Sequence, residues 1–258
     1  MKAVRRTLTA GQMAERSINK RFRKELWNPL IAAVKRYALI RENDRILVLL
    51  EENAESFLMA KLFQTLHRHS EVPFDVDFVL DKGAVSRTSA DTVTHLAETL
   101  DIPLHTVCGP ADKTAAERLL WHARERRCSC AAAPDTLHSV IETLVQCMLS
   151  GNGIRGIPPK EWAGESVQII RPLYCIRDTD IQAFCRHNAL PLSLKEREEG
   201  QNTGFSRTEV RALLEQLKKT NPAVEDELFS AVHDVCLETM VAWTEKGQAK
   251  SFLDTYAF

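Results

Sequence analysis

The 258-residue chain is 44% hydrophobic and 27% charged, which is ordinary for a globular protein long enough to bury a sizeable core. It has no apolar run near the roughly 20 residues that a membrane span requires, and its first residues are polar rather than a hydrophobic leader. Seven scattered cysteines without a C-x-x-C pair argue against a secreted disulfide framework. We therefore expect a cytoplasmic protein with reduced thiols and no membrane partner.

The net charge of −1 conceals a basic N-terminus. Residues 1–41 contain eleven Lys or Arg against two Glu, a net charge of +9, so the remainder is acidic. A basic arm on an acidic body suggests an acidic partner, most commonly a phosphodiester backbone. A solvated helix face would carry the same residues without binding anything, and this alternative stays open. The candidate RNA-binding row on the expected helix is Lys20, Arg21, Arg23, Lys24, Lys35 and Arg36.

In chain order, a basic helix over about 14–39, bent near Pro29, comes first. Five strand-like runs then alternate with helical stretches; the strands are 45–50, 76–80, 102–107, 128–133 and 167–170. The alternation predicts βαβ units and a doubly wound, parallel α/β sheet of about five strands. Two more helices are expected, over 206–219, with a capping box from Ser206 and Glu209, and over 223–245. We divide the chain into a basic helical arm (1–42), an α/β domain (43–195) and a C-terminal helical extension (196–258).

The first strand-to-helix turn is where a phosphate-binding α/β protein normally places glycines. Here it reads Glu51-Glu52-Asn53-Ala54-Glu55-Ser56, and no glycine lies between Gly11 and Gly83. Like charges about 4 Å apart repel by about 4 kcal/mol at an effective dielectric near 20, so a polyphosphate is disfavoured. The glutamates suit a helix N-terminus, which is the structural interpretation. Together with Asp81 at the end of the second strand they could instead form a cation site.

A family resemblance becomes visible further along the chain. The segments that carry it are Gly156-Ile157-Pro158-Pro159-Lys160, Ile169-Ile170-Arg171-Pro172-Leu173, Arg177-Asp178-Thr179-Asp180-Ile181 with Phe184, Asn43–Val48 and Phe229-Ser230-Ala231. Together they are similar to the tRNA 2-thiocytidine synthetases over approximately residues 16 to 240. That family belongs to the PP-loop ATP pyrophosphatases, with an adenine nucleotide alpha hydrolase-like fold. The resemblance implies ATP with magnesium, an iron–sulfur cluster and a tRNA substrate.

The chemical motifs of that family are not preserved here. Its Ser-Gly-Gly-Lys-Asp-Ser loop falls on residues 51–56, where only Ser56 is retained and Glu55 stands for the aspartate. Its Gly-His-His-x-Asp-Asp segment falls on about 134–139, its C-x-x-C segment is deleted between Lys113 and Arg118, and its third cluster cysteine falls near Lys195. Asp81 matches a strand-end aspartate and is the one candidate catalytic residue. We therefore expect no cofactor, neither cluster nor ATP, and no metal site.

Other chemistry-bearing residues give weaker signals. Cys128 and Cys130 lie in a short strand-like run, and cysteine is often buried, so a core role is favoured over a metal or redox pair. His105 and Cys108 could form a nucleophile pair but lack a third member. A glycine-rich loop with Gly151, Gly153 and Arg155 could present amides to an anion, or could be a flexible connection.

Three functions are compatible with this pattern. The first is a non-catalytic relative of the thiolating enzymes that binds tRNA, another RNA or a protein, with a homodimer as a possible assembly. The second is an enzyme with altered chemistry at the acidic turn, and the third is an active tRNA thiolase. The basic arm favours the first over the second, and the missing glycines weigh against the third.

Overall fold

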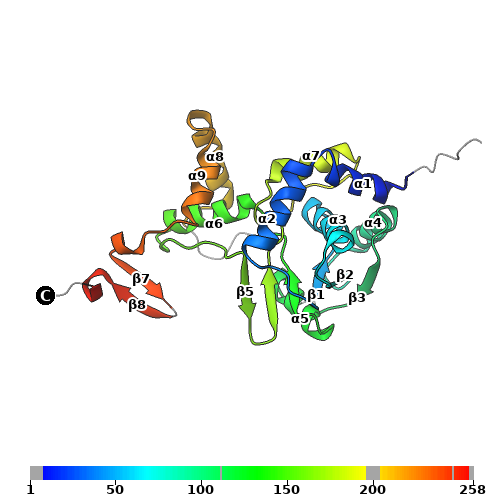
Figure 1. Ribbon diagram of the computed structural model, residues 1–258, viewed down its shortest axis with the longest axis horizontal. Coiled ribbons are helices and arrows are strands. Elements are labelled where there is room, and N and C mark those ends of the chain that lie inside the picture. Colours follow the sequence, from blue (N-terminus) through cyan, green and yellow to red (C-terminus); the bar gives the residue numbers. More distant parts are fainter. Residues whose placement is uncertain (1–7, 111, 196–203, 246, 256–258) are drawn as a thin grey trace, which may run out of the picture. The chain divides into compact units, whose positions relative to one another are not determined.

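The computed structural model describes residues 8–110, 112–195, 204–245 and 247–255. The chain divides into two compact units, one made of residues 1–140 and 157–202 and the other of residues 141–156 and 203–258. The first unit contains the main sheet (Figure 1). Its elements before residue 140 are α1 (Ala10–Asn19), a π-helical turn (Arg23–Trp27), α2 (Asn28–Arg36), β1 (Arg45–Leu49), α3 (Ala54–His69), β2 (Asp75–Asp81), α4 (Arg87–Thr99), β3 (Leu104–Val107), α5 (Ala115–Glu125) and β4 (Cys130–Ala132).

Helix α6 (Leu137–Leu149) carries the chain from the first unit into the second. The first unit then resumes with β5 (Lys160–Ala163), β6 (Val167–Ile170) and α7 (Asp178–His187). The second unit contains α8 (Arg207–Thr220), α9 (Val224–Ala231), a 3₁₀ turn (Leu237–Thr239), the strands β7 (Ala242–Glu245) and β8 (Gln248–Ser251) and a last 3₁₀ turn (Phe252–Thr255). The predicted division at residues 42/43 and 195/196 remains a prediction.

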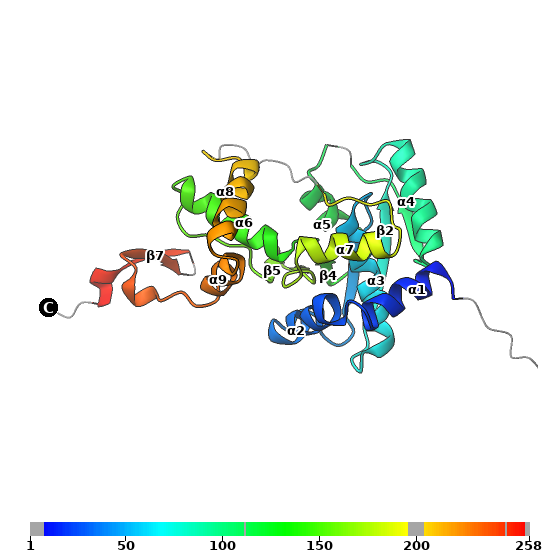
Figure 2. The same ribbon diagram turned by 90° about the horizontal axis from the view of Figure 1, so that it is seen from above.

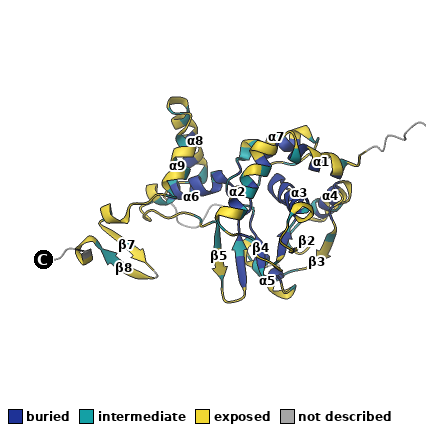
Figure 3. Cartoon of the chain, in the orientation of Figure 1, coloured by how far each residue is buried: buried dark blue, intermediate teal, exposed yellow. Residues whose placement is uncertain are grey.

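The sheet of the first unit has six strands in the order β3-β2-β1-β4-β6-β5. The five predicted strands are all present and parallel, so the predicted doubly wound α/β fold is confirmed. Strand β5 is an addition, antiparallel to β6, and is the last strand in the sheet order. Much of this edge strand is exposed, as Figure 3 shows, and Trp162 on it is exposed as well. The strand order reverses between β1 and β4, and ligands of such sheets bind beyond the carboxyl ends of the strands at that point.

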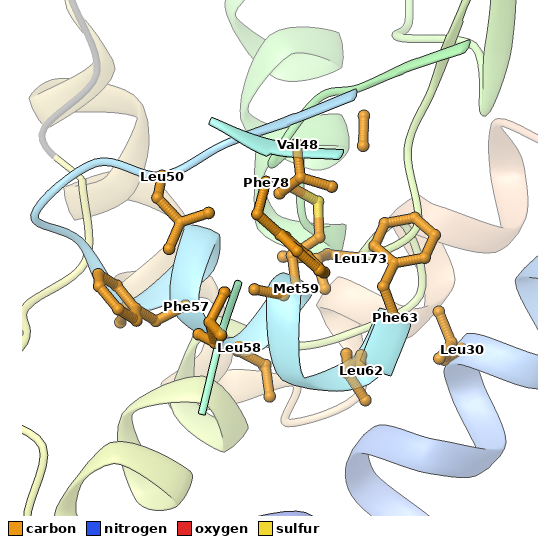
Figure 4. Close-up of a cluster of buried hydrophobic side chains, with 14 of the residues drawn as sticks. Leu30, Val48, Leu50, Phe57, Leu58, Met59, Leu62, Phe63, Phe78 and Leu173 are labelled. Carbon is orange, nitrogen blue, oxygen red and sulfur yellow. The ribbon is translucent and has the colours of Figure 1, made fainter. Parts of the chain in front are cut away.

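Alternation along β1 divides the core between the two faces of the sheet. Val48 joins a large cluster with residues of α3 such as Phe57 and Phe63, drawn in Figure 4. Leu47 joins a smaller cluster on the opposite face, with Leu119 of α5. Successive strand residues point to opposite faces, so one continuous apolar run serves both layers. The apolar run that identified this strand is therefore buried on both sides.

The N-terminal segment is wrongly predicted as one helix bent near Pro29. It consists of α1, a π-helical turn and α2, and the break precedes the proline (Figure 2). Pro29 lies at the start of α2, directly after the π-helical turn. Helix α1 is fixed to the unit by the fully buried Lys61, whose Nζ lies 2.7 Å from Glu15 Oε1 and 2.8 Å from the Leu100 carbonyl oxygen.

The C-terminal segment is also partly mispredicted. The capping box of Ser206 and Glu209 at the start of α8 is confirmed. The long helix expected over 223–245 is wrong, because α9 ends at Ala231 and residues 242–245 pair antiparallel with 248–251. Gly247 has a φ of +79°, a conformation that glycine adopts without strain in a hairpin turn.

Candidate functional site

The turn after β1 is closed by hydrogen bonds within itself. The side chain of Asn53 caps α3 by accepting from the Ser56 amide at 2.9 Å. The Ser56 hydroxyl donates to the Glu51 carbonyl oxygen at 2.8 Å and accepts from the Glu51 amide at 3.2 Å. Asn53 Nδ2 also donates to the Glu51 carboxylate at 3.1 Å. The N-cap of α3 is therefore Asn53 rather than a glutamate, and of the three glutamates Glu55 alone lies in the first turn of the helix.

Two of the first three amides of α3 are engaged by protein acceptors. The amide of Ala54 donates to the Ser193 carbonyl oxygen at 2.8 Å, and that of Ser56 is used by the Asn53 cap. A helix N-terminus binds phosphate through such amides, which must be available to the ligand. In this chain the two amides named are occupied by the protein itself.

The carboxylates of the turn converge on Lys195 rather than on one another. Glu51 Oε2 lies 2.5 Å from Lys195 Nζ, and both oxygens of Glu55 lie 3.1 Å from the Lys195 amide nitrogen. Glu55 is 2% exposed, whereas Glu52 is exposed to solvent. Two of the three glutamates thus have an internal partner that the sequence analysis did not assign to them.

Asp81, the candidate catalytic residue, lies at the end of β2 with 5% exposure and three close donors. It accepts from the amides of Gly83 at 2.9 Å and Gly109 at 2.8 Å, and its other oxygen lies 2.8 Å from His122 Nε2. Burial acts to raise the pKa of Asp81, but the hydrogen bonds from His122, Gly109 and Gly83 together hold it below the ordinary value. A Cβ on Gly109 would lie 2.6 Å from Asp81 Oδ2, so this approach requires glycine. The carboxylate ties the ends of β2 and β3 to α5, and a catalytic role remains a prediction.

A cavity of about 220 Å³ lies at the carboxyl ends of β1, β4 and β6. Its ionisable lining residues are Glu51, Asp135, Arg171 and Lys195, two of each sign. Arg171 Nε lies 2.9 Å from Asp135 Oδ2, as Glu51 lies beside Lys195, so both cations in the lining have an anionic partner. Alanines at 115, 116, 132 and 133 make up much of the remaining wall. The cavity occupies the position where ligands of such sheets bind, but it offers no excess positive charge to a phosphate.

The cysteines do not supply a ligand set for a metal or cluster. Among the described residues, no three His, Cys, Asp or Glu side chains come together in a group that could hold a metal ion. Burial raises the pKa of the Cys128 thiol to about 11 and that of Cys130 to about 12, which keeps both thiols protonated. Their predicted core position is confirmed by exposures of 4% and 1%. His105 faces Asp77 at 3.9 Å, and Cys108 is exposed. The residues that the structure describes therefore do not fit an iron–sulfur cluster.

The predicted RNA-binding cations all lie on the surface of the first unit. Lys20, Arg21, Arg23, Lys24, Lys35 and Arg36 are each exposed. The loop of the second unit with Gly151, Gly153 and Arg155 is likewise exposed, with φ of +70° and +76° at the two glycines. Its role in anion binding remains a prediction. No helix in the described part of the chain is both long and apolar enough to cross a membrane.

Comparison with known proteins gives a consistent relationship. No protein-family model matches the chain. A tRNA-cytidine(32) 2-sulfurtransferase from Geobacter metallireducens is 26% identical over 235 residues, covering 84% of this chain and 91% of that protein. One from Burkholderia ambifaria is 23% identical over 251 residues, covering 90% of this chain and 73% of that protein. Such coverage indicates distant homology along nearly the whole chain.

A solved structure supports the same fold. The U34-tRNA thiolase NcsA from Methanococcus maripaludis, determined with its [4Fe-4S] cluster, superimposes with a TM-score of 0.58. The two chains are 15% identical, and the match covers 80% of this chain and 77% of that one. At this identity the match establishes the fold.

Proposed function

We propose that this chain, a distant homologue of the tRNA-cytidine(32) 2-sulfurtransferases in the PP-loop ATPase superfamily, binds RNA and does not bind ATP at the turn after β1. One observation carries the proposal. Three groups that could hold phosphate at this turn, the amides of Ala54 and Ser56 and the Lys195 ammonium, already pair with the chain's own acceptors. A phosphate that used any of the three would first have to break its present interaction.

The electrostatics oppose ATP for a second reason. The carboxylates of Glu51 and Glu55 lie at the start of α3, where acidic side chains offset the helix dipole of about half a positive charge. The positive charge nearest to them, on Lys195, is already paired with Glu51, so this cation does not remain uncompensated for a phosphate. The same pairing weakens the alternative of a cation-using enzyme at this turn, because the two carboxylates face Lys195. It also weakens the alternative of an active thiolase.

The RNA part of the proposal rests on charge and on relationship. The homologues are named for action on a tRNA cytidine, and this chain retains most of their length. Exposed cations on α1, the π-helical turn and α2 can follow a phosphate backbone, which positions RNA without reading its sequence. The proposed partner is tRNA or another RNA. A homodimer is a possible assembly under the same proposal.

Titrations of the purified chain with ATP–Mg²⁺ and with bulk tRNA test both parts. We expect tRNA binding whose logarithm falls with the logarithm of salt concentration, with a slope of about −2.8 to −3.6 for four phosphate contacts. Replacing Arg21, Arg23 and Lys24 with alanine should flatten that slope by about two to three units. A matched triple variant at the exposed Lys82, Arg87 and Lys219 should leave it unchanged.

The two parts of the proposal fail separately. Micromolar ATP affinity that weakens on substitution of Ser56 or Asp81 would overturn the claim about the turn. Absence of tRNA binding at low salt would overturn the claim about RNA.

A further inference from the structure

A groove of about 560 Å³ runs along α1, beside the C-terminal end of α7, within the first unit. The two helices lie side by side in Figures 1 and 2. From α1 and its flanks the groove is lined by Leu8, Ala10, Met13, Arg16, Ser17, Lys20 and Arg21, and from the end of α7 by His187, Asn188 and Ala189. Its volume lies within the range of about 300–1,000 Å³ typical of ligand sites.

The lining combines positive charge with exposed apolar surface. Arg16, Lys20 and Arg21 supply three cations, and the described lining residues include no carboxylate. Leu8 and Met13 are 43% and 52% exposed, so apolar side chains lie beside the cations of the groove. Cations beside an apolar floor match the two chemical parts of a nucleotide, its phosphate and its base.

Contacts between α1 and the end of α7 fix the shape of the groove. Asn188 Nδ2 donates to Ser17 Oγ at 3.1 Å and to the Phe184 carbonyl oxygen at 2.9 Å, which ties α7 to α1. Ala189 has a φ of +52° and ends α7 in a left-handed turn. The ring of His187 meets that of the buried Phe22 edge-on, with centroids 5.6 Å apart. These contacts hold the walls of the groove in place and do not involve the side chains of Arg16, Lys20 and Arg21.

We infer that this groove holds one unstacked nucleotide of a single-stranded or looped RNA. The base lies over Met13 and beside the His187 ring, and the flanking phosphates meet Arg16, Lys20 and Arg21. Cations at Arg23 and Lys24 lie a short distance further along the chain, in the π-helical turn, for a backbone that leaves the groove. An RNA fits better than an acidic peptide or a lipid headgroup because it supplies phosphates repeatedly along the chain together with a flat apolar base. The inference rests on the proposed RNA binding.

The test compares two charge-matched variants on two probes. The probes are a single-stranded oligonucleotide and a duplex of the same sequence, titrated by fluorescence anisotropy. Lys20→Gln with Arg21→Gln should weaken single-strand binding about tenfold and duplex binding less, because the groove receives only an unpaired nucleotide. Lys35→Gln with Arg36→Gln removes the same charge outside the groove and should weaken both probes alike.

A second pair of variants separates base contact from charge. Met13→Ser and His187→Ala should each weaken single-strand binding about fivefold, the scale of losing one base contact, with no change in the salt slope. Ultraviolet crosslinking should place the oligonucleotide on the peptides that contain Met13 or His187. Thermal unfolding of every variant controls for loss of structure.

The outcomes distinguish this inference from the proposed function. If the wild type binds neither probe at low salt, the RNA-binding proposal fails and this inference fails with it. If the wild type binds but the two charge pairs act alike on both probes, the groove is not the site and RNA binding stands. Binding to vesicles of anionic lipid or to a polyglutamate peptide that competes with the oligonucleotide and depends on Met13 would assign the groove to that partner instead.

Discussion

The turn after β1 and the groove along α1 differ in the charged groups that they offer to a ligand. The turn occupies the position where this fold holds phosphate, yet two of its amides and the carboxylates of Glu51 and Glu55 all have partners within the chain. The groove has three cations in its lining and no carboxylate among the described lining residues. A site is thus defined by the donors that remain available to a ligand, and the position in the fold does not guarantee them.

This difference has a local cause in the sequence. The glycine-free turn places Asn53 at the N-cap of α3, where its side chain accepts from the Ser56 amide, so the helix start has an acceptor from the chain itself. On α1 the carboxylate of Glu15 points inward, to Lys61 and Arg68, and leaves Arg16 and Lys20 on the outer side. The buried pair holds α1 on the unit while its exposed side stays basic.

The largest effect should come from removing a strand-end carboxylate that holds backbone amides. Asp81→Ala leaves His122 and the amides of Gly83 and Gly109 without their acceptor, and should lower the free energy of unfolding by about 3 kcal/mol. Urea denaturation measures this loss. RNA affinity should not change, because Asp81 lies outside the groove lining. A loss of RNA binding in a fully folded variant would contradict the assignment of RNA binding to the groove and not to the strand ends.

The same carboxylate predicts a pH dependence. The folded-state pKa of Asp81 is lowered, so its stabilisation is present above the ordinary value of 3.8 and is lost as pH falls through the lowered pKa. Asp81→Asn, which cannot ionise, should therefore show a shallower decline in stability between pH 5 and pH 3 than the wild type. Parallel denaturation curves across that range would contradict the assignment.

The buried glutamate of the turn should matter more than its exposed neighbour. Glu55→Ala removes the acceptor of the Lys195 amide from a site that is 2% exposed, and should cost about 2 kcal/mol of unfolding free energy. Glu52→Ala is the matched control, because Glu52 is exposed, and should change stability by less than about 0.5 kcal/mol. Equal effects would mean that the turn is held by overall charge rather than by the contact with Lys195.

A smaller effect is expected at the groove wall. Asn188→Ala removes the hydrogen bonds to Ser17 and Phe184 and should cost about 1 kcal/mol of unfolding free energy. Single-strand RNA affinity should fall a few-fold without a change in salt slope, because no charge is removed. An unchanged affinity would show that the tie between α1 and α7 does not shape the binding surface.

The sequence predicted the sheet well because its strands are buried on both faces and read as continuous apolar runs, as residues 45–50 do. It missed β5, whose Lys160–Ala163 run is short and exposed at an edge, and it extended α9 through residues that pair across Gly247. In both cases local pattern was too weak to compete with pairing between strands.

The acidic character of the turn after β1 was predictable from the sequence, but its contact with Lys195 was not. The acidic, glycine-free sequence predicts a turn unsuited to phosphate, and this remains a prediction. Lys195 lies 140 residues beyond Glu55, and no local rule brings them together. The groove was missed for the same reason, because α1 and the end of α7 are brought together only in the folded chain. Its cations had been found as a charge row, without the apolar floor beside them.

The smallest effect on stability is expected for Glu51→Ala, which tests directly why the turn after β1 does not bind phosphate. Glu51→Ala removes one carboxylate from the turn and frees the Lys195 ammonium, so the cavity gains one positive charge. Both side chains of this ion pair are partly exposed, so the free energy of unfolding should change by no more than about 1 kcal/mol.

ATP should still not bind to the Glu51→Ala variant at concentrations up to about 1 mM, which corresponds to about −4 kcal/mol of binding free energy. The reason is that the amides of Ala54 and Ser56 keep their hydrogen bonds to the Ser193 carbonyl oxygen and the Asn53 side chain. The freed lysine would then contact a phosphate without help from these backbone amides. Calorimetric titration with ATP–Mg²⁺ measures this, with Glu52→Ala as the charge-matched control at the exposed position. Micromolar ATP binding by Glu51→Ala alone would show that one ion pair, rather than the occupied amides, keeps the turn closed.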